Sequence, residues 1–278
     1  MDRQSRIHGL HLALPVSCGE GAANAEWTTE MRSLIAIFRL LRLTVHVLHG
    51  LALIKLRFAH LDKAERHQRI GWWSRKTLRV LGVSLQTQGQ GRPGAKLLMA
   101  NHVSWLDIAG VHALLPEARF VSKADVKHWP LVGALVEGVG TLFIERTSKR
   151  DALRVVHQSA EALKAGDSVA FFPEGTTGAG PELLPFHGNL LQAAISTEMP
   201  VQPLVLRWFE PGQPFSSSAR FIGGTTLVQS LWAIASARGL GLSVQVLPAL
   251  DTTHGDRRAL TQHVRELIAA RLGDGSPG

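Results

Sequence analysis

A histidine and an aspartate five residues apart, His102 and Asp107, are the side chains in this sequence best suited to chemistry. An imidazole titrates near neutral pH, and a neighbouring carboxylate can hold one tautomer and stabilise the imidazolium. Such a pair can remove the proton from an alcohol that attacks an activated carbonyl. On spacing alone, an exposed histidine followed by an acidic residue in the first turn of a helix fits these letters about equally well.

The neighbouring sequence predicts how the pair is positioned. Residues 97–100 form a short apolar run that predicts a buried strand, and Asp107 opens an expected helix that Ser104 would cap. The pair would then lie at the carboxyl end of a strand, where open α/β sheets bind their ligands. A serine nucleophile is the less favoured interpretation, because residues 166–170 lack the last glycine of a nucleophile elbow.

Three further sequence blocks follow the pair: residues 140–146 (GTLFIER), 172–176 (FPEGT) and 199–203 (MPVQP). In this order, the four blocks resemble the signature of the glycerophosphate and lysophosphatidic acid acyltransferase family, over about residues 80 to 210. The resemblance implies transfer of a fatty acyl group from acyl-CoA or acyl carrier protein to 1-acyl-sn-glycerol-3-phosphate, giving phosphatidic acid. It also implies that His102 is the base, that Asp107 supports it, and that no cofactor beyond the thioester co-substrate is needed.

The same resemblance implies a set of substrate-binding residues. Arg146 would contact the phosphate of the acceptor, and Glu174, Gly175 and Thr176 would hold the acceptor in a tight turn. Lys123 resembles a basic residue found between the first two blocks and is a further candidate. On the residues alone, a solvated arginine at position 146 is as well supported as a phosphate ligand. For residues 172–176, an ordinary Pro-Glu-Gly surface turn is better supported than a substrate-binding turn.

Two departures from the family pattern leave the acceptor open. Thr177 stands where relatives that act on lysophosphatidate often have arginine or serine, and His187 stands where lysine or arginine is common. Because two positive charges are missing, a zwitterionic acceptor such as lyso-ornithine lipid is an alternative. A second alternative is a non-catalytic membrane-binding protein of the same fold, against which the intact His102 and Asp107 argue.

The elements expected around these blocks alternate between strands and helices. We predict an α/β fold: a single acyltransferase domain over residues 81–272, with a central, mostly parallel sheet flanked by helices. Residues 1–28 would be a flexible leader and residues 273–278 a tail. The strands are expected in apolar runs and the clearest helix at 151–164; the runs are residues 97–100, 141–144, 168–172 and 201–205.

Residues 29–80 are predicted to form a helical segment that associates with a membrane. On a helix, six basic side chains near its start share a stripe roughly 100° wide; they are Arg32, Arg39, Arg42, His46, His49 and Arg57. A spanning helix would carry two of these arginines into hydrocarbon at about 2.5–3.5 kcal/mol each. We therefore favour a helix that lies in the interface with this stripe toward anionic headgroups, over a spanning helix or one packed on the protein's own core.

The composition agrees with a membrane-associated enzyme. The formal charge is +8, with 45% hydrophobic and only 19% charged residues, which favours an anionic lipid surface. Basic residues around Trp72 and Trp73 also suit single-stranded nucleic acid, but no RNA-binding signature follows them, so we expect no nucleic-acid partner. A lone cysteine, Cys18, excludes a disulfide framework, and we predict no metal site. We expect the cytoplasmic face of the inner membrane; the sequence leaves the oligomeric state open.

Overall fold

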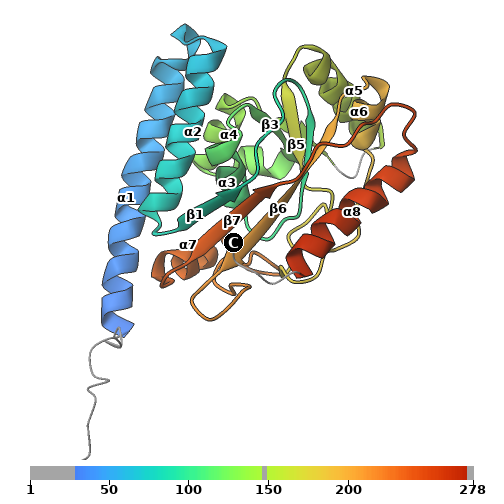
Figure 1. Cartoon of the computed structure of the whole chain (residues 1–278). Helices are drawn as coiled ribbons and strands as arrows, with labels where there is room; N and C mark the ends of the chain where they lie inside the picture. Colours follow the sequence, from blue (N-terminus) through green and yellow to red (C-terminus); the bar gives the residue numbers. More distant parts are fainter. Residues whose placement is uncertain (1–28, 146–148, 274–278) are drawn as a thin grey trace, which may run out of the picture.

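The computed structural model describes residues 29–145 and 149–273, and a seven-stranded sheet lies at its centre (Figure 1). The strands are arranged in the order β1-β7-β6-β2-β5-β3-β4. Neighbours from β6 to β4 pair in parallel, β7 runs antiparallel to β6, and β1 is parallel to β7. The predicted mostly parallel sheet is therefore confirmed. Its strands are β1 Ser84–Gln88, β2 Leu97–Ala100, β3 Ala118–Lys123, β4 Leu142–Ile144, β5 Ser168–Phe171, β6 Val201–Phe209 and β7 Gly241–Val246.

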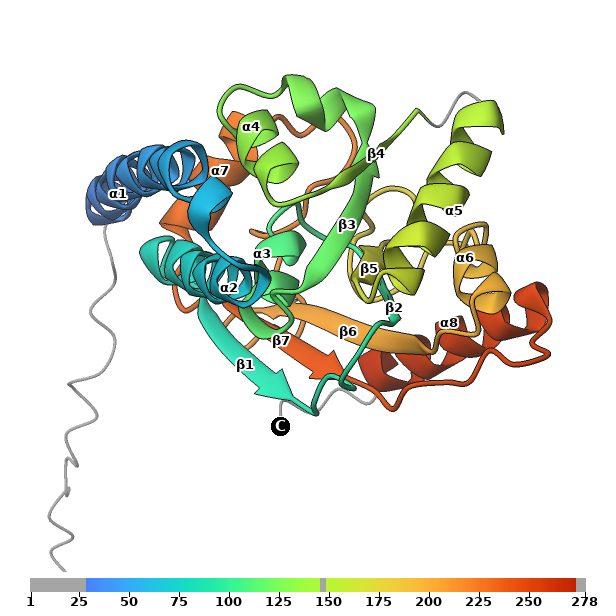
Figure 2. The ribbon, with the colours of Figure 1, turned by 90° about the horizontal axis from the view of Figure 1, so that it is seen from above.

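Helices cover both faces of this sheet (Figure 2). One apolar core joins the sheet to α2, α3 and α7, and a second joins it to α5, α6 and α8. Strands covered on both faces are expected to be apolar, as β2 is throughout and β5 is after Ser168. The helices are α1 Thr29–Leu56, α2 Lys63–Val80, α3 Asp107–Leu114, α4 Val132–Gly138, α5 Lys149–Lys164, α6 Leu191–Ser196, α7 Leu227–Ser236 and α8 Arg257–Gly273, with short 3-10 turns at Phe58–His60 and Ala124–His128.

The inner face of α1 corrects part of the prediction for this helix. Arg39 donates from Nη1 to the carbonyl oxygens of Ala235 and Ala237, at 2.8 and 3.0 Å, at the end of α7. His46 is buried, stacks on the Trp73 ring and bonds through Nε2 to the Trp73 carbonyl oxygen at 3.0 Å. Both side chains were expected to face headgroups and instead bind protein carbonyls. For Arg39 the reason is that the last turn of α7 leaves carbonyl groups without helical partners.

The outer face of α1 is apolar and exposed. Its large side chains are between 47% and 68% exposed and recur at helical spacing; they are Leu34, Ile37, Phe38, Leu41, Val45 and Leu48. Within the described residues, α1 alone is long and apolar enough to cross a membrane by length and composition, with a mean hydropathy of 1.6. The helix therefore turns part of its basic stripe toward the protein and its apolar arc away from it.

Candidate active site

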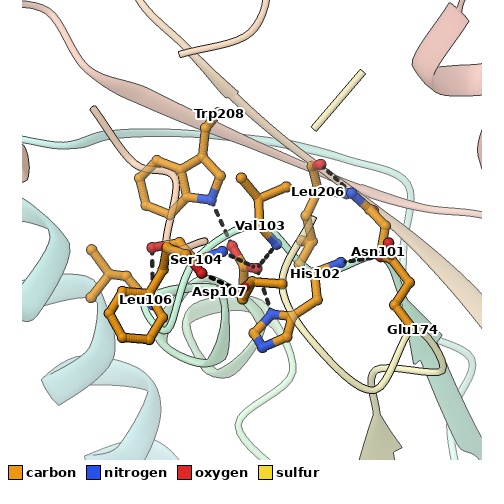
Figure 3. Close-up of polar contacts among 11 residues, drawn as sticks. Asn101, His102, Val103, Ser104, Leu106, Asp107, Glu174, Leu206 and Trp208 are labelled. Carbon is orange, nitrogen blue, oxygen red and sulfur yellow. Dashed lines mark hydrogen bonds and ion pairs between the residues drawn. The ribbon is translucent and has the colours of Figure 1, made fainter. Parts of the chain in front are cut away.

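His102 and Asp107 meet just after the carboxyl end of β2, as the sequence predicted (Figure 3). His102 Nδ1 lies 2.9 Å from Asp107 Oδ2. The same oxygen accepts the backbone N–H groups of Val103 and Ser104, at 2.7 and 2.9 Å. Asp107 is fully buried, whereas 18% of the His102 side chain is exposed. The carboxylate is thus fixed inside the protein while the imidazole reaches its surface.

This arrangement fixes the tautomer of His102. An ionised carboxylate oxygen can only accept hydrogen bonds, so Nδ1 must carry the proton that it donates to Oδ2. The lone pair then remains on Nε2, for which the described residues provide no hydrogen-bond partner. A neutral imidazole with a free Nε2 is the form that accepts a proton from a hydroxyl group.

The other oxygen of Asp107 binds a residue that the sequence analysis missed. Trp208 Nε1 donates to Oδ1 at 2.6 Å from the neighbouring strand β6, and both side chains are buried (Figure 3). Four N–H groups therefore surround the carboxylate and fix its position. The sequence pattern of β6 places Leu204, Leu206 and Trp208 on one face of the strand. This pattern predicts that the indole points inward but not that it binds Asp107.

The predicted role of Ser104 as a helix cap was wrong. Helix α3 begins at Asp107, with Leu106 at the N-cap position and no side-chain capping bond. The Ser104 hydroxyl instead accepts the Leu106 N–H within the preceding turn, at 3.4 Å. Because the Asp107 carboxylate turns back to bind the amides of Val103 and Ser104, it organises the turn that the serine was expected to organise.

Two contacts hold the backbone and ring of His102 in place. The Asn101 side chain binds both the N–H and the carbonyl of Leu206, each at 2.8 Å, and thereby ties the end of β2 to β6. The His102 ring lies flat on Phe172, with ring centroids 3.8 Å apart and planes 3° apart. The stacking restricts rotation of the imidazole, and the Asn101 bonds hold the chain directly before His102.

Glu174 supports the same histidine from the loop after β5. Its Oε1 accepts the backbone N–H of His102 at 2.7 Å, and its Oε2 accepts that of Leu184 at 2.9 Å. Burial raises the pKa of Glu174, and these two hydrogen bonds oppose the shift. Each oxygen of Glu174 thus accepts a backbone N–H group, so the side chain holds the loop against His102. Its predicted contact with the acceptor stays a prediction.

Comparison with known proteins agrees with this site. A lyso-ornithine lipid O-acyltransferase from Pseudomonas aeruginosa is 34% identical over 245 residues, which cover 87% of this chain and 94% of the relative. The chain belongs to the glycerophosphate and lysophosphatidic acid acyltransferase family. Residues 85–207 match the family model described as Acyltransferase, a segment that contains both catalytic candidates.

Two further relatives extend the comparison. A 1-acyl-sn-glycerol-3-phosphate acyltransferase from Neisseria gonorrhoeae is 33% identical over 195 residues, which cover 70% of this chain and 76% of the relative. The crystal structure of the 1-acyl-sn-glycerophosphate acyltransferase PlsC from Thermotoga maritima has the same fold, with a TM-score of 0.67 at 18% identity over 88% of this chain and 96% of that one. This acyltransferase therefore has relatives whose names give different acceptors.

The loop after β5 in this acyltransferase is tied to the catalytic candidate His102 by its backbone. Gly175 adopts φ +73°, a conformation that favours glycine, and donates its N–H to the Phe172 carbonyl at 3.1 Å. The N–H of Gly178 donates to the His102 carbonyl at 2.7 Å. Thr177 donates its hydroxyl to the Phe221 carbonyl, whereas the exposed Thr176 has no hydrogen-bond partner among the described residues. Thr176 is thus the side chain of this turn that is free to meet a ligand.

The predicted cationic residues lie toward the same edge of the sheet or outside the described residues. Lys123 is exposed at the carboxyl end of β3, in register with Ile144 at the end of β4. Arg146 lies outside the described residues, so its contact with a phosphate stays a prediction, as does the role of Lys123. Within residues 29–145 and 149–273, no group of three or more His, Cys, Asp or Glu side chains is arranged to hold a metal ion.

Proposed function

We propose that this acyltransferase esterifies the free hydroxyl of a lysolipid with a fatty acyl group from acyl-CoA or acyl carrier protein, using His102 as the general base. The observation that carries the proposal is the Nδ1 to Oδ2 contact of 2.9 Å, which leaves Nε2 of a surface histidine able to accept a proton. A binding protein of the same fold would not require the buried Asp107 carboxylate, held by four N–H groups, to support the His102 imidazole.

The reaction follows from this geometry. His102 Nε2 removes the proton of the acceptor hydroxyl as its oxygen attacks the thioester carbonyl carbon, and Asp107 stabilises the imidazolium that forms. A new carbon–oxygen bond forms, the carbon–sulfur bond breaks, and the proton passes from His102 to the departing thiolate. A thioester is already activated, so no protein nucleophile is needed and the buried Ser104 takes no part.

For the acceptor, we propose 1-acyl-sn-glycerol-3-phosphate, giving phosphatidic acid. The proposal is supported by the match of residues 140–146 to the family block whose arginine, here Arg146, is implied to bind phosphate. The exposed Lys123 on the neighbouring strand adds a cation at the same edge of the sheet. Paired cations suit a phosphate group better than a single one does.

Lyso-ornithine lipid is the second candidate acceptor, on a separate observation. The Thr177 hydroxyl is bonded to the Phe221 carbonyl, and His187 is exposed on a neighbouring loop, so neither position supplies the fixed cation common in relatives that act on lysophosphatidate. The relative from Pseudomonas aeruginosa, which matches most of both chains, is a lyso-ornithine lipid O-acyltransferase. A zwitterionic acceptor needs less positive charge from this loop.

We propose that the enzyme acts as a monotopic protein on the cytoplasmic face of the inner membrane, where its thioester donors are found. The exposed apolar face of α1 would enter the bilayer interface, together with Val228 and Trp232 of the adjacent α7, which are 75% and 42% exposed. A spanning α1 would have to leave α7, and the guanidinium of Arg39 would lose its two carbonyl partners.

Acyl transfer by the purified full-length chain in detergent tests these proposals. Labelled acyl-CoA and acyl-carrier-protein thioesters are each offered with lysophosphatidate and with lyso-ornithine lipid. We expect His102→Ala to lower turnover by about 10³-fold or more, since a general base and its proton transfer are lost. Vesicle binding should be unchanged, and His263→Ala, which removes an exposed histidine on α8, is the matched control.

The outcomes separate the proposals from one another. Product from lysophosphatidate that depends on His102 supports the first acceptor, and product from lyso-ornithine lipid alone moves the protein to the second. No transfer with any pair of substrates would overturn the catalytic proposal and favour the membrane-binding alternative. Simultaneous loss of turnover and vesicle binding in His102→Ala would mean that the residue is structural.

A further inference from the structure

A cleft lies at the turn between α1 and α2, away from the catalytic residues. It has a volume of about 360 Å³ and is formed by the last two turns of α1, the linker after it and the second turn of α2. Leu53, Leu56 and Leu61 supply apolar walls, and Arg57, Arg69 and His49 supply basic groups. An apolar cleft with several cations on its walls is chemically suited to an anionic amphiphile rather than to a neutral or cationic one.

The two arginines of the cleft have no protein partner within the described residues. Arg57 and Arg69 are both exposed, and no carboxylate or carbonyl among residues 29–145 and 149–273 forms an ion pair or side-chain hydrogen bond with either. The nearby Lys63, by contrast, is bonded to Asp167 at 2.5 Å. A planar guanidinium offers several N–H donors and matches the oxygens of a phosphate group. Two of them on one cleft without partners provide a complementary site for such a group.

The apolar walls of the cleft continue into the exposed face of α1. Leu56 lines the cleft and is 70% exposed, and Val45 and Leu48 extend the same apolar surface along the helix. An acyl chain that leaves a phosphate held at Arg57 and Arg69 can therefore run along this surface into a bilayer. Trp72 of α2 is in ring contact with His49 and has the Lys76 ammonium above it. Tryptophan is enriched at the headgroup level in membrane proteins.

The cleft is distinct from the active site. Lys63 opens α2 next to the cleft and binds Asp167, which directly precedes β5, so this end of the helix lies at the amino edge of the parallel strands. His102 and the Glu174 loop follow the carboxyl ends of β2 and β5, at the opposite edge. In Figure 1, the α1–α2 turn accordingly lies at the far end of the hairpin from α7.

From these observations, we infer that the cleft is a binding site for one membrane phospholipid, whose headgroup phosphate lies between Arg57 and Arg69 and whose acyl chains lie along Leu53, Leu56 and the exposed face of α1. This lipid is neither donor nor acceptor in the reaction. The site fixes the depth and rotation of the α1–α2 hairpin at the membrane surface. The inference does not rest on which lysolipid the enzyme acylates.

Calorimetric titration of the full-length protein with dihexanoyl-phosphatidylglycerol, below the concentration at which it forms micelles, tests the inference. We expect saturable binding in the wild type. The double variant Arg57→Gln/Arg69→Gln should bind at least about tenfold more weakly, since it loses two charged donors that would bond the phosphate. The matched control is Arg66→Gln/Arg79→Gln, which removes the same charge from exposed positions of α2 outside the cleft and should stay within about twofold of the wild type.

Two further ligands separate the lipid from a free anion. Glycerol 3-phosphate, which lacks acyl chains, should bind at least about tenfold more weakly than the short-chain lipid, because the apolar walls stay empty. Leu53→Gln should weaken binding of the lipid but not of glycerol 3-phosphate. The inference is overturned if the wild type shows no saturable binding, if both double variants lose binding equally, or if glycerol 3-phosphate binds as well as the lipid. All four substituted arginines are exposed and without partners in the described structure, so these variants should fold.

Discussion

The two edges of the parallel sheet hold their carboxylates in different ways. At the carboxyl edge, Asp107 and Glu174 accept hydrogen bonds from backbone amides, an imidazole and an indole, and no lysine or arginine among the described residues binds them. At the amino edge, Asp167 pairs with Lys63 and Arg119, and Glu117 with Lys96.

If the proposed function is correct, this difference separates a site for chemistry from sites for stability. In the proposed reaction, a cation beside Asp107 would neutralise the charge that stabilises the imidazolium of His102, whereas N–H groups hold the carboxylate in place without adding a positive charge. At the amino edge, Lys96 is 2% exposed, and a buried ammonium needs a carboxylate such as that of Glu117 at 2.9 Å. We therefore expect substitutions at the carboxyl edge to lower activity more than stability, and matched substitutions at the amino edge to lower stability more than activity.

The largest effect should come from Asp107→Asn. The amide NH₂ of asparagine would face a backbone N–H or the Trp208 indole, and the tautomer of His102 would no longer be fixed. We expect turnover to fall about 10³–10⁴-fold and the free energy of unfolding to fall by about 1–3 kcal/mol. Steady-state kinetics and urea unfolding measure the two effects. Asp167→Asn is the matched control, with turnover within about twofold of the wild type; equal losses in both variants would remove the distinction between the edges.

Glu174→Gln should have the next largest effect. One of its two backbone donors would meet an NH₂ group in place of an oxygen, so the loop and the His102 backbone would shift. We expect kcat to fall about 10–100-fold, because a displacement of about 1 Å in a catalytic group can have that effect. Kinetics at saturating concentrations of both substrates measure it. A variant that retains the kcat of the wild type would show that Glu174 does not position His102.

Trp208→Phe tests the donor that sequence reasoning missed. The substitution removes one N–H from Asp107 while keeping a buried aromatic ring. We expect kcat to fall about tenfold with little change in KM, since one hydrogen bond to a charged group contributes about 1.5–3 kcal/mol. The control is Trp105→Phe, which removes an indole bond to the Ser230 hydroxyl at 3.1 Å and should change kcat by less than about twofold. Similar kcat values for both variants would assign Trp208 a packing role only.

The sequence predicts local geometry well and long-range contacts poorly in this protein. His102 and Asp107 share one strand end, so their meeting follows from a short apolar run and a helix start. Trp208 lies 101 residues beyond Asp107, and the two meet only because β6 pairs with β2, which no local pattern reveals. In the same way, periodicity predicts the basic stripe of α1 but does not reveal that its Arg39 binds carbonyls 196 and 198 residues away.

The smallest expected effect is a difference in the pH dependence of stability at the two edges. Burial alone would raise the pKa of Asp167, but Lys63 and Arg119 lower it below its ordinary value of 3.8. The unfolded chain then binds more protons than the folded one, so the stabilisation, about 1 kcal/mol, is present above pH 3.8 and is lost as the pH falls through the lower, folded-state pKa.

Glu174 should contribute a pH dependence of stability of the opposite sign. Its pKa in the folded protein is raised above 4.5, chiefly by burial, so the folded chain binds more protons and stability falls as the pH rises through that window. Urea unfolding between about pH 3 and pH 7, with the wild type, Asp167→Asn and Glu174→Gln, measures both slopes. The difference in the free energy of unfolding between the wild type and Asp167→Asn should shrink toward acid pH. The difference between the wild type and Glu174→Gln should shrink toward neutral pH. Slopes of the same sign would mean that N–H groups and cations hold these two carboxylates in the same way.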